Sequence, residues 1–209
     1  MIMQGTVDQF LDELASAHPT PGGGSAAAVM GATGAALVSM ACSVSIGKKG
    51  CEAAEAQLQA VRAESETLRQ RLGAMADGDV VAFETLMAGY KLPKVTDEEK
   101  ARRAAAIQTG LRQATEVPLA CARDCAKVIA LARRAGELGY RGVISDAGVG
   151  VLAAYAALRS AALNVYTNAP SLDDQAFAQR ATEELRKLTE SSAQECEAVY
   201  GIVRKRLAP

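Results

Sequence analysis

Residues 19–46 read PTPGGGSAAAVMGATGAALVSMACSVSI, a proline- and glycine-rich loop that leads into an apolar run with no charge before Lys48. The two prolines fix φ and do not continue a helix, so the chain that enters the loop is stiff. Ser25 is a residue type that caps helix N-termini, and the alanine-rich run behind it predicts a long helix that starts there.

The three glycines of this loop have no Cβ, so their backbone N–H groups can approach a bound group closely. N–H donors at the start of a helix have no partner within it, which makes them a natural seat for an anion or for the polar edge of a ring. A tight turn required by a crowded helix would have the same composition, and the loop lacks the lysine of a P-loop. Both interpretations stay open. The candidate binding residues are Pro21, Gly22, Gly23, Gly24 and Ser25.

The uncharged run from Ser25 to Ile46 is long enough to span a membrane. Alanine, glycine, serine and threonine dominate it, and Ala27, Gly31 and Ala35 form a row of small residues suited to close contact between helices. We therefore expect a buried central helix rather than a transmembrane one, and no membrane partner.

The composition narrows the function classes. The 209 residues include 23 basic and 24 acidic side chains, mixed along the chain without a basic patch, which argues against nucleic-acid binding. The five cysteines, in a chain without a signal peptide, predict reduced thiols and a cytoplasmic location. Because His18 is the only histidine, a zinc site lacks ligands, so we expect no metal and no cofactor.

Helical patterns cover almost the whole sequence, and no segment alternates as a β-strand does. Thr6 with Gln9, and Thr96 with Glu99, match the capping box. Pro118 is expected to kink or split the helix that starts at Thr96. With no linker, the sequence predicts one all-α domain over 1–209, a bundle of long antiparallel helices. Besides the helix behind Ser25, the expected helices are one after Thr6 with Val7, Phe10, Leu11 and Leu14 as its apolar stripe, and others over 51–90, from Thr96 onward, over 145–168 and over 172–207.

An aspartate interrupts the apolar seam of the helix over 51–90. Asp79 falls on that seam, whereas Asp77 points away from it and is expected to be solvated. An unpaired buried carboxylate is costly, so Asp79 must find partners. It either fixes the register between helices or lines a functional cavity. The seam follows a 3-4 spacing through Cys51, Ala54, Leu58, Val61, Ser65, Leu68, Leu72, Met75, Asp79, Ala82 and Leu86.

The helix over 145–168 has a second polar arrangement. Asp146 is a candidate site residue, although Ser145 or Asp146 can also serve as a cap. Asn164 and Asn168, one turn apart, can cap the C-terminus, form core hydrogen bonds or contact a ligand. Arg159, among alanine and leucine, needs a carboxylate partner or a bound anion.

Distances along the helices constrain how these residues combine. At 1.5 Å per residue, Asp146 and Asn164 are about 27 Å apart, too far to surround one reacting atom. The glycine loop and Lys48 likewise lie at opposite ends of one helix. If these ends serve one site, a second protomer must bring them together, as an antiparallel homodimer would.

Longer motifs resemble a known family. PTPGGGSAAA, GAALVSMACSVSIGKK, DGDVVAFETLMAGYKLPK, and SDAG with RSAALNVYTNA occur in the order found in the formiminotransferase-cyclodeaminase C-terminal family, and the resemblance covers essentially the whole chain. Through LPKVTDEEKARRAAAIQ, TEVPLACAR and SDAGVGVLAAYAALRSAALNVY it is most similar to the family's stand-alone methenyltetrahydrofolate cyclohydrolases. The resemblance implies an all-α dimeric enzyme that acts on tetrahydrofolate derivatives without a metal.

The implied reaction is hydrolysis of 5,10-methenyltetrahydrofolate to 10-formyltetrahydrofolate. The alternatives are a formimidoyltetrahydrofolate cyclodeaminase, which releases ammonia, and a non-catalytic helical dimer that binds folate or acts as a scaffold. The substrate's methenyl carbon is part of a cationic amidinium, so a carboxylate can act as general base and also offset the positive charge.

We expect Asp79 to be that base, Lys48 to supply or relay a proton, and Asp146 to bind the pterin edge, with the inverse roles of the two aspartates also open. The glycine loop would cradle the pterin or benzoyl region, and Lys49 or Arg159 the glutamate tail. Asn164 and Asn168 stand where the family pattern places them and are expected to contact substrate.

Overall fold

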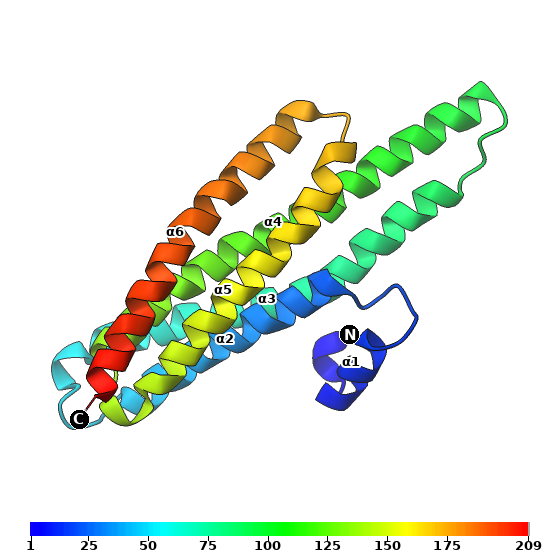
Figure 1. Ribbon diagram of the computed structural model, residues 1–209. Coiled ribbons are helices and arrows are strands. Elements are labelled where there is room, and N and C mark those ends of the chain that lie inside the picture. The colour runs from blue at the N-terminus through cyan, green and yellow to red at the C-terminus, as the bar shows by residue number, and fades with distance from the viewer. Residues whose placement is uncertain (209) are drawn as a thin grey trace.

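The computed structural model of the chain describes residues 1–208, which form one all-α domain (Figure 1). Five long helices run antiparallel to one another in sequence order, and a short sixth helix, α1, lies beside the bundle. The helices are α1 (Val7–Leu14), α2 (Gly23–Ser45), α3 (Glu55–Lys91), α4 (Asp97–Leu138), α5 (Ile144–Asn168) and α6 (Gln175–Leu207), with 3₁₀ turns η1 (Ile2–Gln4), η2 (Glu52–Ala54), η3 (Arg141–Val143) and η4 (Ala169–Ser171).

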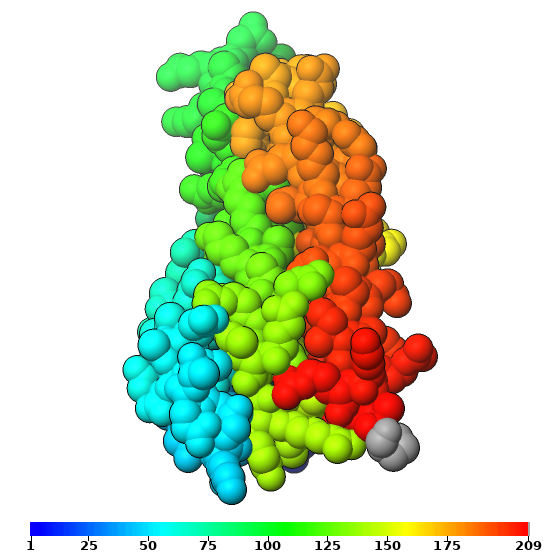
Figure 2. All heavy atoms as spheres, turned by 90° about the vertical axis from the view of Figure 1, so that its left-hand side faces the viewer, coloured from blue at the N-terminus to red at the C-terminus, as the bar shows by residue number. Residues whose placement is uncertain are grey.

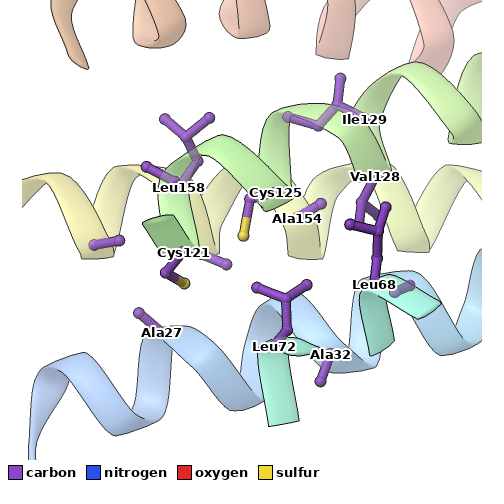
Figure 3. Packing of buried hydrophobic residues seen from close by; sticks show 14 of the residues in the cluster. Ala27, Ala32, Leu68, Leu72, Cys121, Cys125, Val128, Ile129, Ala154 and Leu158 are labelled. Atoms are coloured by element: carbon purple, nitrogen blue, oxygen red, sulfur yellow. The ribbon is translucent and has the colours of Figure 1, made fainter. Parts of the chain in front are cut away.

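Helix α2 is the centre of the bundle and packs against α3, α4 and α5. The predicted row of small residues makes this packing possible, since Ala27, Gly31 and Ala35 are all buried. A Cβ on Gly34 would lie 2.8 Å from the carbonyl oxygen of Gly150, so α2 and α5 touch through their backbones. Figure 3 shows the core that results, in which small α2 side chains meet larger ones from α3, α4 and α5.

The expectation of a buried central helix is confirmed. Two segments, 23–45 and 141–171, are long and apolar enough to pass as membrane spans by length and hydropathy. About half of each apolar window is buried inside the bundle, 56% and 50% respectively. These two apolar segments are therefore core helices of the bundle.

Most expected helices and both capping boxes are confirmed, with three corrections. Gly22, not Ser25, is the N-cap of α2, and Ser25 is a buried residue of the first turn. Pro118 does not split α4, which is continuous from Asp97 to Leu138. The last helix begins after its N-cap Asp174, later than expected.

The bundle covers the apolar stripe of α1 only in part, since Phe10 and Leu14 are half-buried while Val7 and Leu11 are exposed. Helix α1 has no buried residue, and the side chains of Val7 and Leu11 are 74% and 53% exposed. The N-terminal segment is attached to α3 instead through η1, where the backbone N–H of Ile2 donates to Asp77 at 2.8 Å. Val7 and Leu11 therefore form a small exposed apolar surface on the protomer.

A candidate active site at the N-terminus of helix α2

A cleft of about 470 Å³ opens where α2 begins and α5 ends. Its floor contains the predicted carboxylate Asp79, and the predicted glycines Gly22, Gly23 and Gly24 form one edge. Asn164 and Asn168 face it from the last turns of α5. The remaining lining residues are Pro19, Thr20, Ala82, Phe83, Leu86, Met87, Tyr90, Leu111, Ala114, Thr167 and Ser171.

Helix α2 and Asp79 fit together because residue 24 is a glycine. A Cβ on Gly24 would lie 2.0 Å from Oδ1 of Asp79, a distance that no side chain can adopt without displacing the carboxylate. A Cβ on Gly23, in contrast, would meet no atom within 4 Å. Close approach to Asp79 therefore requires only one glycine of the three-glycine motif.

Ser25 holds the carboxylate in place. Its hydroxyl lies 2.9 Å from Oδ2 of Asp79 and 2.9 Å from the carbonyl oxygen of Ala76, so it bridges α2 to α3. The backbone N–H of Ser25 also donates to Asp79. The carboxylate thus receives an N–H of the first turn, which favours its ionised form through the helix dipole.

Burial raises the pKa of Asp79 above its usual value, and the two hydrogen bonds from Ser25 oppose this rise. No lysine or arginine in residues 1–208 forms an ion pair with this carboxylate. A half-buried carboxylate without a cationic neighbour, at the wall of an open cleft, is suited to a positively charged guest.

Asp124 shows what a purely structural aspartate looks like in the same bundle. Its side chain is 1% exposed and forms ion pairs with Arg71 of α3 at 3.0 Å and with Lys127 at 3.1 Å. Asp79 differs in both respects, because it has no basic partner and it faces a cleft. The contrast favours the functional interpretation of Asp79 over the register-fixing one.

The two asparagines are oriented by their amide nitrogens. Nδ2 of Asn164 donates to the carbonyl oxygen of Ser160 at 3.2 Å, and Nδ2 of Asn168 donates to that of Ala114 at 2.8 Å. Pro118 explains the second bond, because proline has no N–H and leaves the Ala114 carbonyl without its helical partner. Each Oδ1 remains as a hydrogen-bond acceptor for donors on a ligand.

Three predicted site residues lie at the other end of the bundle. Lys48 and Lys49 follow the C-terminus of α2, about 33 Å from its glycine end, given a rise of 1.5 Å per residue over its 23 residues. Asp146 lies in the first turn of α5. Figure 2 shows this end, where residues 46–54, the α4–α5 connection and the end of α6 meet. Lys48 stands 5.8 Å from the ring centre of Tyr140 there.

Arg159 lies on the outer surface of α5 and not in the cleft. Its guanidinium is 3.3 Å from the Tyr155 hydroxyl and 5.9 Å from the ring centre of the same residue. The structure therefore brings together the glycines, Asp79, Asn164 and Asn168, and separates Lys48, Lys49, Asp146 and Arg159 from them within one chain.

The apolar and aromatic lining of the cleft was not predictable from the sequence pattern. Phe83 and Tyr90 lie beyond Asp79 on the same helix, and Leu111 and Ala114 come from α4. For the α3 residues, the only sequence signal of a role in the site is their place within a family motif. Periodicity separates buried positions from exposed ones, but it does not separate core positions from cleft positions. No group of three or more His, Cys, Asp or Glu residues within 1–208 is placed to hold a metal ion.

Comparison with known proteins identifies the family of the chain. The sequence model of the formiminotransferase-cyclodeaminase family matches residues 6–187, and the chain belongs to that family. It is 55% identical to a methenyltetrahydrofolate cyclohydrolase from Methylorubrum extorquens, over 97% of both chains. It is 34% identical to a formimidoyltransferase-cyclodeaminase from Sus scrofa, over 95% of this chain but 36% of that protein. A crystal structure of a formiminotetrahydrofolate cyclodeaminase from Thermotoga maritima superposes with a TM-score of 0.81 at 26% identity, covering 99% of this chain and 98% of that one.

Proposed function

We propose that the protein hydrolyses 5,10-methenyltetrahydrofolate to 10-formyltetrahydrofolate. The proposal is supported by the Methylorubrum relative, which matches over nearly the full length of both chains. The observation that carries it is the carboxylate of Asp79, which Ser25 holds at the cleft without any basic side chain to neutralise it. The substrate brings the missing positive charge, because its methenyl carbon is part of an amidinium.

Asp79 acts as the general base. A water molecule between its carboxylate and the methenyl carbon adds its oxygen to that carbon, and its proton passes to Asp79. The resulting carbinolamine is neutral, and it collapses by breaking the carbon–N5 bond while its hydroxyl proton is lost and N5 gains one. The net products are 10-formyltetrahydrofolate and one proton. The amidinium is already electrophilic, so the residues of the chain suffice for this scheme and no cofactor is invoked.

The rest of the cleft suits a flat, polar-edged ring system. Phe83, Leu86, Met87 and Tyr90 offer apolar surface for stacking. The Oδ1 atoms of Asn164 and Asn168 accept hydrogen bonds from ring N–H groups. The loop residues Gly22 to Gly24 form the edge nearest to Asp79. Pro21, expected from the sequence to belong to the site, lines a separate pocket beside α1 instead.

A homodimer would supply the residues that one chain keeps away from the cleft. Helices α2 and α5 pack side by side. On the outward face of each helix, residues repeat at a spacing of three and four, and Arg159 is the one charged residue among them. Such an exposed seam is typical of a helix that packs on another helix. In an antiparallel pair, Lys48 and Asp146 of the partner subunit would approach the glycine end, where Lys48 relays a proton and Asp146 binds the pterin. The seam consists of Thr33, Leu37, Met40 and Val44 on α2 and Val149, Leu152, Ala156, Arg159, Leu163 and Tyr166 on α5.

A cyclodeaminase is the second candidate, and the Thermotoga structure favours it because it covers almost the whole chain. Ring closure of a formimino group with loss of ammonia would use the same carboxylate and the same cleft.

Because all five cysteines are free and buried, we place the protein in the cytoplasm, with neither membrane nor nucleic acid as partner.

A spectroscopic assay tests these functions. Loss of methenyltetrahydrofolate absorbance in the presence of the protein should exceed spontaneous hydrolysis. The formimino substrate is then supplied, and formation of the methenyl product is followed at the same wavelength. Turnover of the formimino substrate alone would overturn the cyclohydrolase proposal in favour of the cyclodeaminase. Folate binding without turnover of either would instead leave a non-catalytic folate-binding dimer.

A further inference from the structure

A second cavity, of about 480 Å³, lies next to the candidate active site at the projecting end of the α3–α4 pair. Three basic side chains line it, those of Lys94, Lys100 and Arg103, together with a single acidic one, Asp173. Its other lining residues are Ala104, Ile107 and Gln108. Nothing in the reaction at Asp79 uses these bases.

The two cavities are neighbours along the same face of α4. Ile107 lines the basic cavity, and Leu111, one turn further along, lines the active-site cleft. The turn between α5 and α6 borders both, through Ser171 on one side and Asp173 on the other. Gln108 fixes this turn on α4, because it donates to the Ser171 carbonyl at 3.1 Å and accepts from the Asp173 N–H at 2.9 Å.

Arg103 of α4 connects the two cavities, because it contacts Tyr90 of α3. Its Nε lies 3.3 Å from the carbonyl oxygen of Tyr90, and its guanidinium stands 5.7 Å from the centre of the Tyr90 ring. Tyr90 lines the active-site cleft. Arg103 is thus anchored to an active-site residue through Nε, while its two terminal nitrogens are left for a carboxylate.

The charges of this cavity are largely uncompensated. Within residues 1–208, neither Lys94 nor Arg103 forms an ion pair, and Lys100 is paired only with the exposed Asp97, at 2.8 Å. Two unpaired cations around a cavity beside the candidate active site are suited to binding an anionic part of a substrate.

We propose that this basic cavity binds the glutamate tail of the folate, with Arg103 and Lys94 as the partners of its carboxylates; the inference rests on the proposed function. Tetrahydrofolates carry a p-aminobenzoyl group that ends in glutamate, so the tail lies well away from the reacting carbon. Asp79 and Tyr90 are 11 residues apart on α3, which corresponds to about 16 Å. That separation matches the reach of an extended p-aminobenzoylglutamate. Lys49 and Arg159, expected from the sequence to pair with the tail, lie at the far end of α2 and on the outer face of α5.

The test compares ligands with and without glutamate. Calorimetry measures the Kd of 5-formyltetrahydrofolate, its triglutamate form and 5-formyltetrahydropteroate, which lacks glutamate. In Arg103→Gln and Lys94→Gln variants we expect Kd for the monoglutamate to rise roughly ten-fold and for the triglutamate to rise further, while Kd for the pteroate stays unchanged. Arg102→Gln is the matched control, since it removes the same charge from the neighbouring position, which does not line the cavity.

Binding and turnover are measured separately, so failure of the glutamate subsite can be distinguished from failure of the cyclohydrolase activity. If the variants shift all three Kd values equally, or none, the glutamate does not bind here. If the pteroate binds as tightly as the folate to the unmodified protein, the inference also fails. Turnover of methenyltetrahydrofolate is measured in parallel, so glutamate-dependent binding without any turnover would support the subsite and contradict the cyclohydrolase. Thermal unfolding of each variant shows that it is folded.

Discussion

The hydroxyl and the backbone N–H of Ser25 hold the carboxylate of Asp79, and the glycine at position 24 leaves space for it. Each of these contacts fixes the position of the carboxylate, and none of them neutralises its charge. The carboxylate is therefore pre-oriented and electrically uncompensated, which is an unstable arrangement for the folded protein alone. A functional site commonly sacrifices stability in this way.

Replacing Asp79 by Asn should separate activity from stability. Asn keeps an oxygen that accepts from Ser25, but it does not accept a proton, so we expect kcat to fall by about 10²–10⁴-fold. Burial raises the pKa of Asp79 in the folded state, so between the usual pKa of an aspartate and this raised pKa the folded state keeps a proton that the unfolded state loses. Stability then falls as pH rises through that window and remains lower above it.

At pH 7 the melting temperature of Asp79→Asn should accordingly equal or exceed that of the unmodified protein, and the difference should vanish below the unfolded-state pKa. Kinetics of methenyl hydrolysis and thermal unfolding across pH measure the two effects. Full turnover in a folded Asp79→Asn protein would remove the carboxylate from the mechanism.

The pH profile of the unmodified enzyme gives a second prediction. Loss of kcat/KM toward acid reports protonation of Asp79 in the free enzyme, whose pKa is raised by burial. The bound cationic substrate favours the carboxylate, so the acid limb of kcat should lie at lower pH than that of kcat/KM. If the acid limbs of kcat and kcat/KM coincide, the charge of the bound substrate does not change the pKa of Asp79.

Gly24 and Gly23 form a matched pair for testing the glycine motif. Gly24→Ala places a methyl group against Oδ1 of Asp79 and displaces the carboxylate, so we expect at least about a 10²-fold loss of kcat/KM. Gly23→Ala meets open space and should keep near-normal activity, with up to about 1 kcal/mol of added stability from helix propensity. Equal activity of the two variants would contradict the proposed role of residue 24.

At the scale of helices, Pro118 connects the core to the site. Proline chemistry predicted a kink or a split of α4 at this residue. The helix is not split, and Asn168 of α5 takes the place of the missing helical donor. A proline in α4 therefore fixes an asparagine in the cleft of another helix. The alternative of a split was wrong because the compensating donor lies 50 residues further along the chain, where local sequence does not reveal it.

A double-mutant cycle tests this link. Asn168→Ala leaves the Ala114 carbonyl without its donor and should destabilise the protein by about 1–3 kcal/mol, toward the lower end because the cleft admits water. Pro118→Ala supplies a new backbone N–H at position 118, so Asn168→Ala should cost about 1 kcal/mol less in that background. Urea unfolding of the four proteins measures the coupling, and purely additive costs would contradict it.

The sequence predicted the elements of the fold well and the site in part. The seam of α3 and the small residues of α2 define which faces are buried, and an aspartate on such a seam is visible without coordinates. Ser25 was given the wrong role because Gly22 can cap α2 with its backbone alone, which frees the hydroxyl to reach α3. The basic cavity was not predicted, because Lys94, Lys100 and Arg103 become relevant only once α4 is placed beside the cleft.

At the scale of the whole molecule, the two ends of the bundle carry different parts of the predicted site. Asp79 and the asparagines lie at one end, and Lys48 and Asp146 at the other. Val7 and Leu11 of α1 and the seam of α2 and α5 are exposed in the protomer. A second copy packed antiparallel on α2 and α5 would cover the seam and unite the two ends.

Leu152→Glu tests whether this surface is the dimer interface. Leu152 is 44% exposed at the middle of the seam, and a charge there would be buried without a partner in the dimer. We expect a monomer by light scattering, with the fold intact and kcat/KM reduced by at least about 10²-fold, because the partner subunit's Lys48 and Asp146 are lost. Tyr200→Glu on α6, which is 45% exposed and lies off the seam, should remain a fully active dimer. A monomeric unmodified protein with full turnover would show that one chain suffices and would confine the chemistry to the end that holds Asp79.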